Sequence, residues 1–174
     1  MSEMIVPSLV YGLFPALLVY AAATDAVSRR IPNWVSGVLL LGFLVLAVAS
    51  GMGWATFGMS MGVGALAFAF GFTMFGLGQM GAGDAKLITA TVPWFGFTVG
   101  AMEYAILFSL LGVLITIPFM LRRFQQVEML LASNALSAKL IGKSKHRRET
   151  PYGVAIAAAG LLMVPSLAKL HGLG

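Results

Sequence analysis

Residues 54–78 read WATFGMSMGVGALAFAFGFTMFGLG, a long apolar run without a charged side chain. About 20 such residues cross the hydrocarbon core of a bilayer as a helix. In lipid the backbone must satisfy its own hydrogen bonds, so this run is predicted to be helical. Gly58 and Gly62 form a small-xxx-small pair, which predicts close packing against a neighbouring helix.

The composition of the whole chain agrees with a membrane protein. Of its 174 residues, 59% are hydrophobic and only 10% are charged, whereas a soluble domain carries roughly 25% charged residues. This composition excludes both a soluble globule and a disordered chain. The absence of cysteine excludes disulfide scaffolds, thiolate metal sites and cysteine nucleophiles.

Five further apolar runs accompany the first. We therefore predict an all-α membrane protein with six transmembrane helices in one polytopic domain, residues 1–174. The predicted spans are residues 5–24, 34–50, 54–78, 85–100, 104–121 and 151–170.

Basic residues predict the orientation. Ten of the eleven Lys and Arg side chains fall in three connections, which contain Arg29 and Arg30, Lys86, and the segment 122–150. With six spans these connections share one side, which the positive-inside rule places in the cytoplasm. Both termini are then outside, and we expect a multi-pass membrane protein.

The segment 122–150 is the one sizeable polar stretch and is predicted to be a cytoplasmic loop before the last helix. Apolar residues at three- and four-residue spacing favour an amphipathic helix on the membrane surface. A solvated loop that fixes the topology fits the sequence equally well. In either form, its basic residues are expected to contact anionic lipid.

Two carboxylates stand out among the six acidic residues. Asp25 follows the first predicted span and Asp84 precedes the fourth, and each lies at the predicted cytoplasmic end of its span. Carboxylates in such places are costly and are by default functional candidates, although each alone also fits a helix-flanking charge in water. Because both are predicted at one depth on one leaflet, they favour a joint function.

Two converging aspartates predict acid–base chemistry. Both cannot ionise comfortably, so one keeps its proton and can polarise a carbonyl, while the other takes a proton from water. This chemistry requires no metal and no cofactor, and we expect neither.

The neighbours of both aspartates are informative. Gly81 and Gly83 precede Asp84, and glycine lets a substrate chain approach the carboxylate closely. After Asp25, Pro32 forces Ile31 out of helical geometry, so the chain is predicted to turn there. Asn33 is then expected to cap the second span.

These motifs resemble the prepilin peptidase family, intramembrane aspartic proteases of the Gly-x-Gly-Asp type. The resemblance rests on an aspartate, a basic pair and Ile-Pro-Asn, then Gly-x-Gly-Asp-x-Lys, and finally Pro-Tyr-Gly in the last span. It implies that Asp25 and Asp84 are the catalytic aspartates. The residues that it implies as support for the site or for substrate binding are Ile31, Pro32, Asn33, Gly81, Gly83, Lys86, Pro151, Tyr152 and Gly153.

The resemblance also implies a function. Family members cleave the leader of type IV prepilins at the cytoplasmic face of the membrane, so the resemblance implies a multi-pass protein of the bacterial inner membrane. The large members carry an insert with paired cysteines and also methylate the product, so this cysteine-free chain resembles the short form of Flp (tight-adherence) pilus systems. An archaeal preflagellin-type peptidase is a close relative that fits the same motifs.

The expected partners are prepilin or pseudopilin precursors and membrane lipid, with pilus-assembly machinery as a further candidate and no nucleic acid. Two other functions use the same sequence features. One is a small transporter or proton pathway through the two aspartates, which would place them near the bilayer midplane. The other is a non-catalytic subunit of a pilus or secretion machine, which would tolerate substitution of both.

Overall fold

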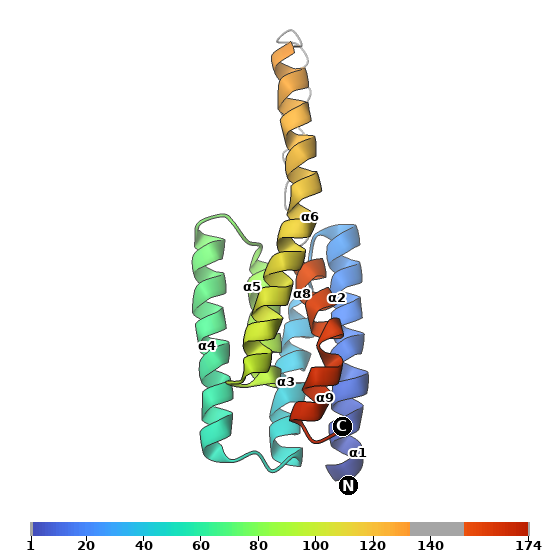
Figure 1. Cartoon of the computed structure of the whole chain (residues 1–174), viewed down its shortest axis with the longest axis vertical. Helices are drawn as coiled ribbons and strands as arrows, with labels where there is room; N and C mark the ends of the chain where they lie inside the picture. Colours follow the sequence, from blue (N-terminus) through green and yellow to red (C-terminus); the bar gives the residue numbers. More distant parts are fainter. Residues whose placement is uncertain (1, 133–151, 174) are drawn as a thin grey trace.

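The computed structural model describes residues 2–132 and 152–173, and every regular element within these ranges is a helix. The helices run along one long axis and pack side by side (Figure 1). The prediction of an all-helical protein is therefore confirmed.

The first apolar run forms a continuous helical segment made of α1 (Ser2–Pro7), η1 (Ser8–Leu13) and α2 (Phe14–Ser28). The wider π-helical turn of η1 lies between Pro7 and Pro15. Neither proline has an amide hydrogen to give to the preceding turn, and a wider turn accommodates the missing bonds. Arg29 then takes a left-handed conformation, with φ of 55°, and ends the helix.

Helix α3 (Asn33–Ala49) begins directly after the predicted turn. Pro32 is extended, with φ of −62° and ψ of 137°, as expected for a residue that precedes a helix. Asn33 does not cap this helix, because it already lies inside the first turn and makes no capping hydrogen bond. Its side chain instead bonds to another helix, as described below.

Helix α4 (Trp54–Gly76) confirms the helix predicted for residues 54–78. Its packing glycines differ from those expected. A Cβ atom on Gly58 or Gly62 would meet nothing within 4 Å, whereas one on Gly71 would lie 2.9 Å from the Ala85 Cβ. The small-xxx-small pair thus faces away from the described bundle, and Gly71 is the close contact with the next helix.

The fourth apolar run is shorter than predicted. It forms α5 (Ala82–Thr91) and a 3-10 turn, η2 (Val92–Phe95), and not a helix through residue 100. Pro93 lies in η2, and Gly96 has a positive φ of 63°, so the chain turns there. Helix α5 packs against α3, α4 and α8, and most of its residues are buried.

Helix α6 (Val99–Ala132) is longer than the predicted span 104–121 and extends beyond the other helices (Figure 1). Residues 122–132 continue this helix, so the first part of the predicted loop 122–150 is neither a loop nor a separate surface helix. The remainder of that segment lies outside the described residues.

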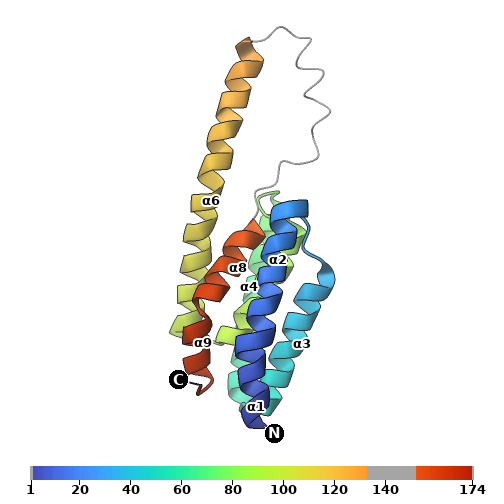
Figure 2. The same cartoon turned by 90° about the vertical axis from the view of Figure 1, so that its right-hand side faces the viewer.

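The last apolar run is a broken helix, made of α8 (Tyr152–Leu162) and α9 (Val164–Leu170), with a bend of 51° between them. Pro165 in the first turn of α9 explains the break, because it cannot donate the backbone bond that would continue α8. The start of α1 and the end of α9 lie at the same end of the bundle (Figure 2).

Three described helices are long and apolar enough to cross a membrane, namely Met4–Ser28, Trp54–Gly76 and Val99–Pro118, and the bent pair α8–α9 adds a fourth candidate. Helix α3 is a shorter apolar helix. The protein is thus a membrane protein by length and composition of its helices, while six spans and their orientation stay a prediction.

Buried hydrogen bonds fix the short helix α5 inside the bundle. The Tyr104 hydroxyl of α6 donates to the Ile156 carbonyl of α8 at 3.3 Å and lies 2.9 Å from the Thr91 hydroxyl of α5. The Trp94 indole N–H donates to the Leu39 carbonyl of α3 at 3.2 Å. In an apolar interior each satisfied polar group avoids a desolvation cost, so these bonds hold the end of α5 against α6 and the following turn η2 against α3.

Candidate active site

Asp25 lies in the last turn of α2 and is only 5% exposed. Its Oδ2 accepts a hydrogen bond from the backbone N–H of Val154 at 3.2 Å. Val154 is in the first turn of α8, where backbone N–H groups lack partners within the helix. The positive end of α8 therefore faces the Asp25 carboxylate and stabilises negative charge on it.

Gly153 allows this close approach of α8. A Cβ atom at this position would lie 2.8 Å from Oδ2 and 3.0 Å from Cγ of Asp25, and 2.6 Å from the Ile31 Cδ1. Real side chains do not tolerate such distances, so only glycine fits without displacing the carboxylate. The predicted support role of Gly153 thus has a steric basis.

Asp84 lies in the first turn of α5 and is only 6% exposed. Gly81 precedes the helix in an extended conformation, with ψ of 147°, and no side chain caps this end. Gly83 packs on the other motif, because its Cβ would lie 3.3 Å from the Ile31 Cβ. The two glycines therefore bring the start of α5 against the turn that follows Asp25.

One pocket joins the two aspartates. It has a volume of about 220 Å³ and receives residues from the end of α2, the turn before α3 and the start of α5. Its lining consists of Asp25, Arg29, Arg30, Ile31, Asn33, Gly81, Ala82, Gly83, Asp84 and Lys86.

A hydrogen bond ties the two sequence motifs together. The Lys86 ammonium donates to the Asn33 Oδ1 at 2.9 Å, so the first turn of α3 is linked to the second turn of α5. A charged donor strengthens such a bond. Asn33 and Lys86 thus join the helices on both sides of the aspartate pocket.

The predicted site residues are brought together with three exceptions. Pro32 shapes the turn but does not line the pocket, and Tyr152 lines a neighbouring cavity. Pro151 lies outside the described residues. The remaining predicted residues line the pocket or, for Gly153, contact the Asp25 carboxylate.

The sequence reasoning missed four residues at the site. Arg29, Arg30 and Ala82 line the pocket, and Val154 donates to Asp25. The basic pair follows Asp25 by four and five residues, and its charge and its place before Ile-Pro-Asn predict the topology and the family resemblance but not a position in the site. Val154 contributes through its backbone, so its side chain carries no signal that a motif search can detect.

The arrangement suits acid–base chemistry on a bond brought between two carboxylates. Two nearly buried aspartates line one small pocket, and Arg29, Arg30 and Lys86 line the same pocket. Two carboxylates that line one poorly solvated pocket can supply an acid and a base whenever one of them holds a proton.

Residues 12–121 match the type IV leader peptidase family. The matched segment contains both aspartates and the motifs around them, and it ends before α8. No curated protein and no solved structure matches the chain significantly.

Proposed function

This chain belongs to the type IV leader peptidase family, and on that premise we propose that it is an aspartic endopeptidase that removes the leader of type IV prepilins. The proposed substrates are prepilins or pseudopilins of the Flp kind, cleaved at the cytoplasmic face of the bacterial inner membrane. The absence of cysteine supports the short, non-methylating form of the enzyme.

The single observation that supports this proposal is that Asp25 and Asp84, from two separate helices, line one pocket while both are almost fully buried. Burial of two carboxylates is costly, so a fold that keeps both of them buried beside one pocket indicates a function for them. In the pocket, a scissile peptide bond can meet both acids at once.

The proposed reaction needs only these two groups and one water molecule. One aspartate is ionised and takes a proton from the water, whose oxygen bonds to the carbonyl carbon of the scissile peptide. The other aspartate is protonated and donates to the carbonyl oxygen. When the tetrahedral intermediate collapses, the C–N bond breaks and the leaving amine takes a proton from the pair.

The test is cleavage of a purified leader-bearing prepilin by the full-length protein in lipid vesicles, followed by the mass of the new N-terminus. We expect a single cut after the leader. Asp25→Asn and Asp84→Asn should each lower the rate by at least about a hundredfold, because each removes a proton donor or acceptor.

Glu103→Gln is the matched control, since Glu103 is exposed and does not line the aspartate pocket. It should cleave at the wild-type rate. Normal cleavage by either aspartate variant would overturn the role of that residue, and no cleavage by the wild-type protein would overturn the proposed function.

A further inference from the structure

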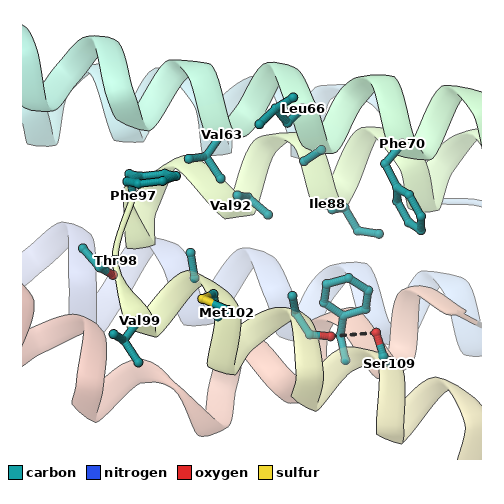
Figure 3. A pocket seen from close by; sticks show the side chains of 14 residues that line it. Val63, Leu66, Phe70, Ile88, Val92, Phe97, Thr98, Val99, Met102 and Ser109 are labelled. Atoms are coloured by element: carbon teal, nitrogen blue, oxygen red, sulfur yellow. Dashed lines mark hydrogen bonds between the residues drawn. The ribbon is translucent and has the colours of Figure 1, made fainter.

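A large apolar groove lies between α4 and α6, apart from the aspartate pocket. Its volume is about 900 Å³. Val63, Leu66 and Phe70 lie on one side and Val99, Met102 and Ser109 on the other, with Ile88 and Val92 between them (Figure 3). The floor is therefore the helix that carries Asp84 and the short turn that follows it.

The groove is open to the side. The hydroxyls of Thr98 and Ser109 line it, and both already donate to backbone carbonyls. Its rims are exposed, with Leu66 at 69% and Met102 at 67%. The Ser109 hydroxyl donates to the Ala105 carbonyl at 2.7 Å (Figure 3), and the Thr98 hydroxyl donates to the Phe95 carbonyl at 2.7 Å. Because these hydroxyls are already bonded, the groove fits an apolar occupant.

The wall from α6 suits close helix packing. Ala101, Ala105 and Ser109 follow one another at four-residue spacing, and all three line the groove. Helices associate in lipid through close backbone approach along such small residues. A flexible acyl chain does not need this spacing, whereas a second helix does.

The groove extends toward the aspartate pocket without sharing lining residues with it. Ile88 in its floor follows Asp84 by one helical turn. A second cavity of about 240 Å³ shares Phe70, Ile88, Phe108 and Ser109 with the groove. That cavity is also lined by Met80 and Tyr152, the immediate neighbours of Gly81 and Gly153 at the site.

We propose that this groove docks the apolar transmembrane helix of the substrate, and this inference rests on the proposed function. The helix enters sideways from the lipid between α4 and α6 and packs on α5. Its cytoplasmic end then lies beside Gly81, where the chain that leads to the leader reaches Asp25 and Asp84.

The first test fills the groove. Ala67 lines it, whereas Ala69 lies exposed on the same helix outside the lining. The KM is measured for two substrates: a full-length prepilin, and a short peptide that contains the cleavage site but no apolar helix. In Ala67→Phe we expect the KM for the prepilin to rise about tenfold while the KM for the peptide stays unchanged, because the prepilin helix loses a packing contact. Ala69→Phe should leave both KM values unchanged.

Three outcomes separate this inference from the proposed function. If the wild-type protein cleaves the prepilin and the two variants have equal KM values, the proposed docking groove is wrong and the proposed function stands. Equal rises of KM for prepilin and peptide in Ala67→Phe also overturn the proposed docking groove, because the effect is then on the fold. A wild-type protein that cleaves no prepilin overturns the proposed function.

The second test detects binding without cleavage. The chain has no cysteine, so one introduced thiol is unique. A photoreactive group on Leu66→Cys should crosslink to the apolar helix of the prepilin, whereas one on Phe68→Cys, exposed on α4 outside the groove, should not. Equal yields at both positions, or crosslinks from Leu66→Cys only to lipid or to a second copy of this chain, overturn the proposal.

Discussion

At the scale of single residues, the candidate site depends on atoms that are small or belong to the backbone. Gly153 leaves room for the Asp25 carboxylate, and the Val154 N–H binds it. Gly83 leaves room for Ile31. The two acids are therefore positioned by close backbone approach as much as by side chains.

Gly153→Ala tests this close approach. The added methyl group would overlap the Asp25 carboxylate and the Ile31 side chain, so we expect a loss of about tenfold or more in kcat and a destabilisation of about 1–3 kcal/mol. Cleavage rates and thermal unfolding in detergent measure both effects.

Gly37→Ala is the control for this substitution, because a Cβ at Gly37 would meet nothing within 4 Å. It should retain the wild-type rate. Full activity in Gly153→Ala would show that the first turn of α8 does not hold Asp25 in place.

At the scale of elements, the contact between α4 and α5 places Asp84. A Cβ on Gly71 would lie 2.9 Å from the Cβ and 3.1 Å from the Cα of Ala85, the residue next to Asp84. Any side chain at position 71 must therefore push the backbone of α5 away from α4.

We expect Gly71→Ala to destabilise the protein by about 1–3 kcal/mol, because the backbone of α5 must shift to relieve the contact. The same shift should lower the rate of prepilin cleavage. Gly62→Ala on the same helix meets open space and should be neutral or stabilising by up to about 1 kcal/mol, since alanine favours a helix over glycine. Equal unfolding temperatures of the two variants would contradict this account.

The sequence predicted the elements unequally well. Pro32 marked the turn after Asp25, and the uncharged run of α4 marked its helix, because these signals act locally. The predicted span 85–100 extends beyond the end of α5. An apolar run has the same composition whether lipid or other helices cover it, so composition does not show where the helix ends. Pro93 and Gly96 were the local signals that end it.

Packing partners were harder to predict than helices. Gly58 and Gly62 have the spacing typical of helix contacts, yet Gly64 and Gly71 are the glycines of this helix that lie close to described neighbours, namely Pro93 and Ala85. Spacing along one helix does not reveal which face meets a neighbour. The sequence also predicts one depth for the two aspartates from the ends of their apolar runs. It does not show which helix faces meet, so the pocket that both aspartates line could not be predicted.

At the scale of the whole molecule, the end of the bundle away from the aspartates has its own polar contact. His171, directly after α9, contacts the Trp94 carbonyl through Nε2 at 3.1 Å. Burial lowers the pKa of His171 from its ordinary value of 6.5, and the hydrogen bond to Trp94 partly opposes this shift.

The unfolded chain therefore binds a proton at His171 at a higher pH than the folded protein does. The contribution of His171 to stability is present above its ordinary pKa and is lost as the pH falls toward the folded-state value. We expect the unfolding temperature to fall between about pH 7.5 and pH 5, and to fall less in His171→Gln, which does not titrate. Identical pH profiles of the two proteins would contradict this contribution.

The length of α6 determines how far the molecule reaches out of the bilayer. Its 34 residues measure about 51 Å along the axis at roughly 1.5 Å per residue, whereas the hydrocarbon layer is only about 30 Å thick. If α6 stands upright with its first residue at one edge of the hydrocarbon layer, about 20 Å of the helix extends beyond the other edge, through the headgroup region and into water. A partner that approaches from that side meets the tip of this helix before it meets the lipid headgroups.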